Sequence, residues 1–301
     1  MKKILILGAN SYIGTSFHNY LSVQYPGEYD VERISLRGDD WKKGKWSEYD
    51  SIINVTGKAH ADISKLSEEQ KQEYYTVNCE LAVEAAKKAI ADGAAQYIYF
   101  SSIIVYGDSS NSRKPVRITS ETKPEPTNFY GDSKWQAEQR LQKMFDAAAG
   151  HTQLVILRPP MIYGNGSKGN FQMLVKLAGK MPAFPTYRNE RSMIYVENLT
   201  EFLRILVEEG TAGIFLPQNA EYVSTTDMVY EIAQAEGRKL LRAGWMNPFV
   251  KIALYIPGKI GKMSKKAFGS MTIDKELSPD ISDYQQFDLR ESIQRSISSK
   301  K

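Results

Sequence analysis

The chain contains few of the residues that form disulfides or bind metals. Its 301 residues include one cysteine, Cys79, and three histidines, His18, His60 and His151. A single cysteine excludes a disulfide within the chain, and the histidines do not follow metal-ligand spacings such as HxxxH. We therefore expect no metal site, and this composition suits a reducing, cytoplasmic environment.

Long apolar runs and dense basic tracts are absent as well. No run of eighteen uncharged apolar residues occurs, so we expect no membrane span. The apolar run Ile4–Leu7, which follows the first three residues, is too short for a signal peptide. The net charge is +4, with Lys and Arg spread along the chain, and this distribution argues against a nucleic-acid partner.

One segment leaves two interpretations open. Pro248–Lys266 mixes apolar residues with several lysines. It can form a pair of helices in a substrate-binding lobe, broken at Pro257-Gly258. It can also lie on the surface of a membrane, where such mixtures bind.

Short apolar strands alternate with helical patterns in the first half of the chain. This alternation predicts a parallel sheet covered by helices on both faces. Ser67-Glu68-Glu69-Gln70 is a capping box, so the second helix has a defined start. The expected strands are Lys3–Leu7, Val31–Leu36, Ser51–Val55, Gln96–Ser101 and Gln153–Leu157, and the expected helices lie near Ile13–Gln24, Ser67–Ala91 and Tyr130–Ala149.

After about residue 160 the alternation becomes looser. Helices near Val196–Glu208 and Thr225–Glu236 are separated by a short strand at Gly213–Leu216. We expect an α/β fold with a doubly wound parallel sheet over residues 1–160. A smaller C-terminal lobe over 161–301, partly interleaved with the sheet, would bind the substrate.

The stretch "ILILGANSYIG" ends the first strand and starts the first helix. A glycine-rich turn at this position lets backbone amides approach a pyrophosphate, and the helix N-terminus adds a favourable field. Gly8 would make the tight turn, and Gly14 would let the helix pack close to the strand. The position between them, usually glycine in dinucleotide-binding loops, holds Ser11, whose hydroxyl can itself donate to a phosphate oxygen. A plain strand–turn–helix is the alternative.

The stretch "NFYGDSKWQAEQRL" places Tyr130 and Lys134 four residues apart. On a helix this spacing puts both on one face, and Ala137, Leu141 and Phe145 continue that face toward the interior. A phenol is a poor base at neutral pH, but a neighbouring ammonium and an oxidised nicotinamide lower its pKa. An ordinary amphipathic helix would show the same spacing.

A strand that ends in Ser101-Ser102 supplies a third polar position. Ligands of open α/β sheets bind at the carboxyl ends of the strands. The three motifs occur in the order and on the elements that a hydride-transfer site requires, and this combination is more specific than any one of them.

With these motifs the chain resembles the extended short-chain dehydrogenase/reductase family, in its nucleotide-sugar epimerase, dehydratase and reductase branch, over nearly its full length. "GANSYIG" resembles the family's GxxGxxG with Ser11 for the second glycine, and "YGDSK" resembles its YxxxK pair. "FSSIIVYG" resembles the strand end whose catalytic Ser stands four residues before the Tyr of VYG. The resemblance implies a Rossmann-type fold and the catalytic residues Ser102, Tyr130 and Lys134.

The resemblance also implies the residues that bind cofactor and substrate. "LRPPMIYGNG" is similar to the loop that passes the nicotinamide, and "RSMIYVENL" to a segment whose Arg contacts the diphosphate of the substrate. "KGNF" is similar to a substrate loop. The implied cofactor residues are Gly8, Asn10, Ser11, Tyr12, Ile13, Gly14, Arg37, Thr56, Gly57, Asn78, Tyr130, Lys134 and Pro159, and the implied substrate residues are Ser102, Asn170 and Arg191.

Two positions carry further alternatives. Asn78 is the polar member of a buried helical stripe, so it either cross-links the backbone or contacts the cofactor. Arg37 follows the second strand, where an arginine suits the 2′-phosphate of NADP, whereas Asp39 and Asp40 keep NAD possible. Only thirteen residues join Arg37 to the next strand, so we expect the usual helix and strand between them to be missing.

The departures from the family pattern narrow the reaction. Dehydratases of this branch carry Asp-Glu after the catalytic residue, whereas this chain has Ile103-Ile104. Hydride transfer at C4 of a nucleotide-diphospho-sugar remains, and we favour reduction of a UDP-linked 4-keto-6-deoxy amino sugar for surface polysaccharide synthesis over 4-epimerisation. His60, in "GKAHAD", would touch substrate or be structural. A non-catalytic cofactor-binding scaffold and an enzyme with a steroid or flavonol substrate are remoter alternatives, and the family resemblance suggests a homodimer.

Overall fold

The computed structural model describes residues 1–58, 66–108, 114–148, 150–281 and 283–298, without the side chain of Lys259. The chain divides into two compact units. The first unit consists of residues 1–107, 123–159 and 199–217, and the second of 108–122, 160–198 and 218–301. His60 lies outside the described residues.

The first unit is built on a parallel sheet of six strands. In spatial order these are β10 (Gly213–Phe215), β6 (Gln153–Leu157), β4 (Gln96–Phe100), β3 (Ser51–Asn54), β1 (Lys2–Leu7) and β2 (Tyr29–Ile34). Every pairing is parallel. The chain leaves β1 in one direction toward β2 and returns on its other side as β3, so the topological switch point lies between β1 and β3.

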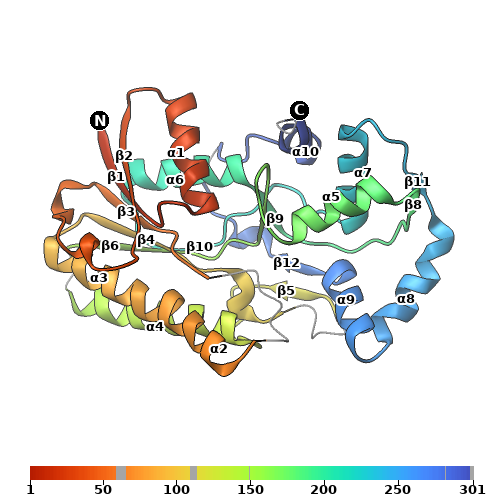
Figure 1. The fold of residues 1–301 in the computed structure, drawn as a ribbon, viewed down its shortest axis with the longest axis horizontal. Helices are drawn as coiled ribbons and strands as arrows, with labels where there is room; N and C mark the ends of the chain where they lie inside the picture. The colour runs from red at the N-terminus through yellow and green to blue at the C-terminus, as the bar shows by residue number, and fades with distance from the viewer. Residues whose placement is uncertain (59–65, 109–113, 149, 282, 299–301) are drawn as a thin grey trace. The chain divides into compact units, whose positions relative to one another are not determined.

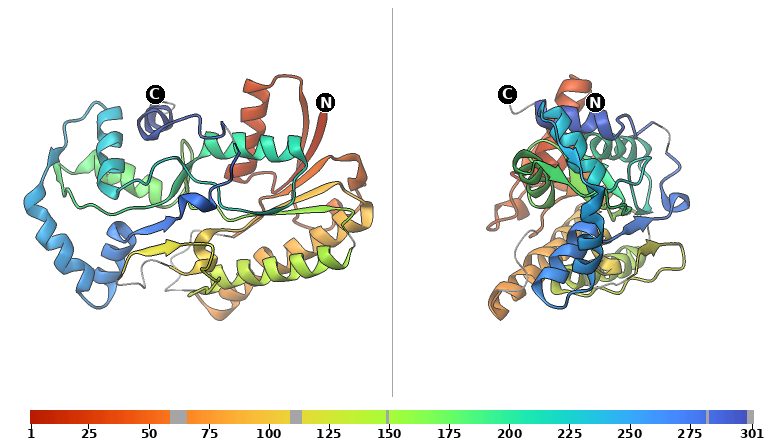
Figure 2. Two further views of the ribbon diagram at one scale, coloured as in Figure 1. Left: turned by 180° about the vertical axis from the view of Figure 1, so that it is seen from behind. Right: turned by 90° about the vertical axis from the view of Figure 1, so that its right-hand side faces the viewer.

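Helices cover both faces of this sheet (Figures 1 and 2). One face carries α2 (Glu68–Tyr75), α3 (Leu81–Asp92) and α4 (Phe129–Ala147), and the other carries α1 (Tyr12–Gln24) and α6 (Val196–Glu209). The central strands are apolar on both faces because both faces are buried, as parallel sheets require. This architecture confirms the expected doubly wound α/β fold.

Besides differences of a residue or two at element ends, one strand is displaced along the chain and one helix is interrupted relative to the sequence-based expectation. The strand expected at Val31–Leu36 is β2 at Tyr29–Ile34, because the amides of Gly8 and Ala9 bond to the Ile34 carbonyl and end the ladder there. The helix expected at Ser67–Ala91 starts at the predicted capping box but is interrupted by a π-helical segment at Thr76–Glu80. Such segments widen a helix by one residue and often lie at functional sites.

The link between β2 and β3 contains no strand and no α-helix, as expected. Two short 3₁₀ turns, η1 (Asp40–Lys42) and η2 (Trp46–Glu48), replace them. Trp41 and Trp46 are buried, and their rings lie 5.7 Å apart between centroids. They join the hydrophobic core of the first unit in place of the missing elements.

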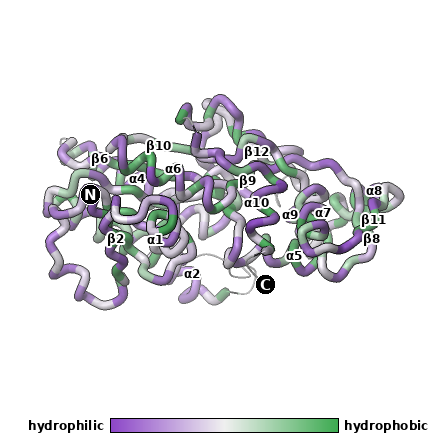
Figure 3. Tube along the Cα trace, turned by 90° about the horizontal axis from the view of Figure 1, so that it is seen from above, coloured by the Kyte–Doolittle hydropathy of each residue, from purple (hydrophilic) through white to green (hydrophobic). Residues whose placement is uncertain are grey.

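The second unit combines short strand pairs with amphipathic helices. The pairs are β5 (Val116–Ile118) with β12 (Met271–Ile273), β7 (Met161–Tyr163) with β9 (Met193–Tyr195), and β8 (Ala183–Phe184) with β11 (Leu241–Arg242). α7 (Thr225–Ala235) packs on both α5 (Asn170–Lys180) and α10 (Leu289–Ser298). Hydrophobic and hydrophilic stretches interleave along these helices (Figure 3).

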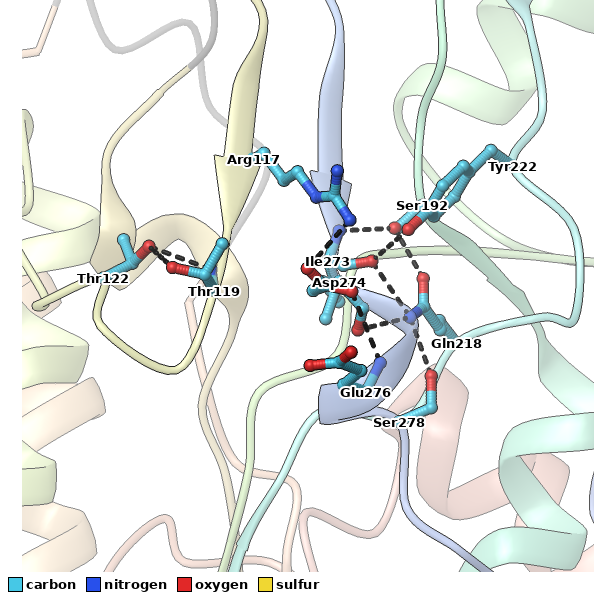
Figure 4. Close-up of polar contacts among 10 residues, drawn as sticks. All are labelled: Arg117, Thr119, Thr122, Ser192, Gln218, Tyr222, Ile273, Asp274, Glu276 and Ser278. Atoms are coloured by element: carbon cyan, nitrogen blue, oxygen red, sulfur yellow. Dashed lines mark hydrogen bonds and ion pairs between the residues drawn. The ribbon is translucent and has the colours of Figure 1, made fainter.

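Side-chain hydrogen bonds hold the short strands of the second unit together. Buried Gln218 accepts a bond from Ser192 Oγ at 2.6 Å and donates to the Ile273 carbonyl at 3.2 Å and to Ser278 Oγ at 2.7 Å (Figure 4). Strands of two or three residues form few ladder bonds, so these contacts supply the missing connections.

Candidate active site

The glycine-rich loop lies at the switch point of the sheet. Ser11 is the N-cap of α1, and its hydroxyl oxygen accepts a bond from the Gly14 amide at 3.0 Å. A Cβ at Gly14 would lie 2.7 Å from that oxygen and 2.8 Å from Ile6 Cγ2, so only glycine lets α1 approach β1 this closely. The Ser11 proton remains available to an acceptor because its oxygen accepts the cap bond.

The neighbouring strand completes this end of the site. Gly8 has a φ of 114°, and a Cβ there would lie 3.3 Å from Thr56 Oγ1. Thr56 donates its hydroxyl to the Leu7 carbonyl at 3.0 Å, which ties the ends of β3 and β1 together. Asn10 is exposed, and Tyr12 and Ile13 are half-buried in the first turn of α1. The loop therefore presents backbone and a hydroxyl at a helix N-terminus, the arrangement that binds phosphate.

A cavity of about 410 Å³ lies beside β2 and the two 3₁₀ turns. Exposed Arg37 lines it together with Trp41 and Lys45. The buried Trp41 Nε1 has no hydrogen-bond partner among the described residues. Asp39 forms a 2.7 Å ion pair with Lys42, and Asp40 forms a 2.6 Å ion pair with Lys43, so neighbouring lysines engage both acidic side chains.

Ser102 and Tyr130 come from two elements in close contact. Ser102 caps the 3₁₀ turn η5 (Ile103–Tyr106) and accepts a bond from the Ile104 amide at 3.3 Å. Tyr130 is the second residue of α4, whose N-cap Asn128 accepts from the Gly131 amide at 2.9 Å. A Cβ at Gly131 would lie 2.8 Å from the Ile104 carbonyl oxygen. Glycine therefore lets the start of α4 lie directly against the turn that follows Ser102.

Lys134 is buried, 4% exposed, on the inward face of α4. Its ammonium donates to the Phe100 carbonyl at 2.7 Å and lies 4.8 Å from the centroid of the Tyr99 ring. A Cβ at Gly57 would lie 3.3 Å from the same nitrogen. Burial lowers the pKa of Lys134 to about 8, although Glu138 acts in the opposite direction. The predicted inward face is confirmed, since Ala137, Leu141 and Phe145 are also buried.

Tyr130 is half-buried and packs against Tyr74, with ring centroids 6.2 Å apart. Burial, followed by the neighbouring Tyr74, raises its pKa to about 12. The lowering of the Tyr130 pKa that we expect from Lys134 is not seen in this structure, in which the Lys134 ammonium donates to the Phe100 carbonyl. At neutral pH Tyr130 therefore keeps its proton.

Asn78 lies in the π-helical segment and is fully buried. Its side-chain oxygen accepts from the Lys58 amide at 2.7 Å, and its side-chain nitrogen donates to the Lys58 carbonyl at 3.2 Å and to Ser133 Oγ at 3.1 Å. Asn78 thus joins the segment after β3 to α4 one residue before Lys134. These bonds form the structural cross-link that is one of the two interpretations of Asn78.

Sequence reasoning missed one supporting network. Arg158, after β6, makes a buried ion pair with Glu138 of α4 at 2.5 Å and donates to Tyr106 Oη at 2.6 Å. The carbonyl of the next residue, Pro159, accepts from the Ile103 amide at 3.2 Å. The network holds α4, η5 and the end of β6 together. Its one sequence signal is that Glu138 lies four residues after Lys134 on the same inward face.

Besides Ser102, which lies in the first unit, the predicted substrate residues Asn170 and Arg191 belong to the second unit. Asn170 is the first residue of α5 and is half-buried. Arg191 is half-buried and pairs through its backbone with Val223 and Met271. Its guanidinium donates to the Lys266 carbonyl at 2.7 Å. Burial lowers the pKa of Arg191, and Asp108 partly opposes this effect.

The sequence of the chain matches a known family. Residues 1–244 match the family described as RmlD substrate binding domain. The chain belongs to this family. Its family and its relatives are those of NAD(P)-dependent enzymes of the short-chain dehydrogenase/reductase type, so the expected family resemblance and the expected enzyme class are confirmed.

Two curated relatives align with most of this chain. It is 28% identical to a UDP-glucose 4-epimerase of Vibrio cholerae, over 92% of this chain and 85% of the relative. It is 24% identical to the N-acetyl-alpha-D-glucosaminyl-diphospho-ditrans,octacis-undecaprenol 4-epimerase of Escherichia coli O157:H7, over 90% and 83%. These relatives and the family match support the expected class of activity, 4-epimerase or 4-keto reductase, without choosing between the two.

Solved structures agree on the fold. The dTDP-4-dehydrorhamnose reductase of Bacillus anthracis in complex with NADP superimposes with a TM-score of 0.68 at 17% identity, covering 100% of both chains. Two further similar structures, a UDP-glucuronic acid 4-epimerase from Bacillus cereus and RMD from Pseudomonas aeruginosa, are described in complex with NAD and NADPH, respectively.

Proposed function

We propose that this enzyme reduces the C4 keto group of a UDP-linked 4-keto-6-deoxy amino sugar with NADPH, as a step in surface polysaccharide synthesis. The observation that carries the proposal is the position of Tyr130, on a helix that packs directly against the turn after Ser102, with Lys134 one turn further along the same helix. A reduction needs a proton donor at this position, which the phenol of a tyrosine supplies, whereas an epimerase would use the same residue first as a base and then as an acid.

The residues of the loop fit a dinucleotide. Gly8 and Gly57 leave space where a Cβ would approach Thr56 or Lys134, and Ser11 keeps a hydroxyl proton at the N-terminus of α1. The pyrophosphate would be held by this N-terminus, and Lys134 and Asn78, which lie beside Gly57, would face the nicotinamide ribose. When bound, the nicotinamide supplies the hydride that reduces C4.

The protein residues manage the proton and the charge. Ser102 would donate a hydrogen bond to the C4 oxygen and polarise the carbonyl. Tyr130 would transfer its phenolic proton to this oxygen as the hydride reaches C4, which leaves a C4 hydroxyl and a phenolate. Lys134, held by the Phe100 carbonyl at 2.7 Å, would stabilise that phenolate before a proton from solvent restores it. In the second unit, Asn170 and Arg191 would bind the nucleotide diphosphate.

Two observations support NADP over NAD. Arg37 lines the cavity beside β2 and carries the charge that a 2′-phosphate needs. Asp39 and Asp40, which would bind the ribose hydroxyls of NAD, are both paired with lysines. Arg37→Gln should lower the ratio of kcat/KM for NADPH to that for NADH by about tenfold or more. Lys45→Gln, which lines the same cavity, is the control.

A 4-epimerase is the second candidate because two relatives that cover most of the chain carry that name. An epimerase would take and return the same hydride and keep its NAD. The E. coli relative also acts, by its name, on a sugar whose diphosphate is attached to undecaprenol. The substrate panel should therefore contain both UDP-linked and polyprenol-diphosphate-linked sugars.

The absorbance at 340 nm separates these candidates. Stoichiometric loss of NADPH absorbance with a UDP-4-keto sugar supports the reductase. C4 interconversion of a sugar without net loss supports the epimerase, and silence with every member of the panel contradicts both. Tyr130→Phe should lower kcat by at least about 10²-fold with cofactor binding unchanged. Tyr230→Phe, whose hydroxyl bonds to the Phe184 carbonyl at 3.3 Å, is the matched control.

The expected homodimer and the expected cytoplasmic location stay predictions. A homodimer through helices that include α4 would double the mass measured by light scattering. A cytoplasmic location would place the enzyme in the soluble or inner-membrane fraction after cell lysis. Among the described helices, none has the length and apolar character to cross a membrane.

A further inference from the structure

Two helices at the edge of the second unit expose unusually many large apolar side chains. These helices, α8 (Asn247–Tyr255) and α9 (Lys259–Phe268), pack against each other around Ile256–Gly258 (Figure 1). We call residues 245–268 the hairpin. The side chains that are at least 60% exposed are Trp245, Phe249, Ile252, Tyr255, Ile260 and Met263.

This exposure is concentrated rather than scattered. Twelve large hydrophobic side chains are exposed among the described residues, and eight of them lie between Leu241 and Met263. Single exposed apolar residues are normal, but a contiguous group marks a surface that another phase or molecule covers. The hairpin confirms the helix pair expected from Pro257-Gly258. Val250 and Phe268 pack in the lobe, but most of the large apolar side chains of the hairpin are exposed.

The charge of the same stretch indicates the chemistry of the partner. Residues 237–273 contain eight Lys and Arg and no Asp or Glu, whereas the other 264 residues hold 31 basic and 35 acidic side chains. The whole positive excess of the chain therefore lies in this stretch. Lys251, Lys262 and Lys266 are exposed beside the apolar residues. Apolar and aromatic side chains with interspersed lysines match the interface of an anionic bilayer, whereas a protein partner would have to be both apolar and acidic.

The hairpin is joined to the predicted diphosphate-binding residue. Arg191 donates to the carbonyl of Lys266, in the last turn of α9, at 2.7 Å. The backbone of Arg191 also pairs with Met271, three residues after α9 ends. A change in the position of α9 on docking would therefore reach Arg191 directly.

We propose that the hairpin docks the enzyme on the surface of an anionic lipid bilayer. The apolar side chains enter the boundary between headgroups and acyl chains, and the lysines bind lipid phosphates. The docking goes beyond the proposed reaction and does not depend on it, since the exposed residues and their charge are independent of Ser102, Tyr130 and Lys134.

Vesicle binding tests the proposal with the full chain. Co-sedimentation is measured with vesicles of phosphatidylcholine alone and of phosphatidylcholine with phosphatidylglycerol. Binding should be strong only with the anionic lipid, should fall as salt is raised, and should shift the emission of the exposed Trp245 to shorter wavelength. Trp245→Phe should remove most of this shift, because Trp41 and Trp46 are buried and Trp135 is half-buried on α4, outside the hairpin.

Two double variants separate the apolar and the electrostatic contributions. Ile252→Gln with Ile260→Gln, and Lys262→Glu with Lys266→Glu, should each weaken binding at least tenfold. Val23→Gln, an exposed apolar residue of α1, and Lys143→Glu, an exposed lysine of α4, are the matched controls. An unchanged circular dichroism spectrum and unchanged NADPH binding exclude unfolding as the cause of a loss.

Three results would overturn the proposal. The first is equal binding to neutral and anionic vesicles, or none to either. The second is binding that the controls weaken as much as the hairpin variants do. The third is that the protein binds no vesicles and is a dimer by light scattering without lipid, whereas the Ile252→Gln and Ile260→Gln double variant is a monomer. That outcome would make a second copy of the chain the partner of the hairpin.

Discussion

Replacing Lys134 by methionine should make the protein more stable at neutral pH while it abolishes catalysis. Lys134 is 4% exposed, and burial lowers the pKa of its ammonium from 10.5 to about 8. This difference corresponds to about 3 kcal/mol of penalty for holding the charged form in the folded state. Methionine has a similar length and no charge, so the variant avoids the penalty. The variant also loses the hydrogen bond to the Phe100 carbonyl, and this loss reduces the gain in stability by about 1 kcal/mol.

The pH dependence isolates this effect. Between pH 8 and 10.5 the unfolded chain keeps the proton of Lys134 while the folded chain releases it. The stability of the wild type therefore rises with pH across this window by about 3 kcal/mol relative to the variant. Below pH 8 the full penalty is present and the methionine variant should be more stable by about 2 kcal/mol. Above 10.5 the wild type should be the more stable of the two.

Urea unfolding of both proteins at pH 7, 8, 9 and 10 measures the difference. Groups other than Lys134 titrate alike in both proteins and cancel in the comparison. A difference in the free energy of unfolding that stays constant from pH 7 to pH 10 would refute the reasoning. Lys143→Met, an exposed lysine of the same helix, should show no such pH-dependent gap.

The remaining predictions concern contacts that support the site. Gly131→Ala should lower kcat at least about tenfold, because its Cβ meets the Ile104 carbonyl at 2.8 Å and moves α4 away from η5. Glu138→Gln should lower the free energy of unfolding by about 3–5 kcal/mol, measured in urea, because Arg158 keeps a buried charge without its counter-ion. Ser11→Ala should lower the free energy of unfolding, measured in urea, by about 1 kcal/mol through loss of the helix cap, whereas Ser11→Gly should lower it by only a few tenths because glycine is tolerated at an N-cap.

Each of these predictions has a result that contradicts it. Wild-type kcat in Gly131→Ala would mean that the contact with η5 does not position Tyr130. A loss below about 1 kcal/mol in Glu138→Gln would mean that the Arg158 charge finds another partner or water. A Ser11→Ala variant as stable as the wild type would show that the cap bond to the Gly14 amide contributes little.

The sequence was informative where a pattern is local and repeated. The alternation of strands and helices, the capping box at Ser67 and the inward face of α4 are all patterns of adjacent turns or strands, and the structure has them. The end of β2 was placed two residues too late because the Gly8 and Ala9 amides, not the apolar run, end its ladder. The π-helical segment at Thr76–Glu80 has no local signal beyond the buried Asn78.

Long-range polar pairs could not be predicted in the same way. Arg158 and Glu138 are twenty residues apart, and nothing in either local pattern says that they meet. The two- and three-residue strands of the second unit depend on Gln218, a single buried amide that bonds to residues 55 and 60 positions later. Such elements are too short for a hydrophobic period, so only the folded chain specifies them.

These contacts also explain why a costly lysine is kept. Within the part of the chain that the structure describes, the ammonium of Lys134 has one backbone acceptor and the Tyr99 ring around it. The carboxylate of Glu138 raises the pKa of Lys134 from a distance but bonds to Arg158 instead. A stability-optimised core would pair or remove such a charge. The arrangement makes sense if the positive charge is needed by a group that appears only during turnover, and a phenolate on Tyr130 is the group that the same helix supplies. The stability gained in Lys134→Met and the activity lost in it are then two measurements of one unpaired charge.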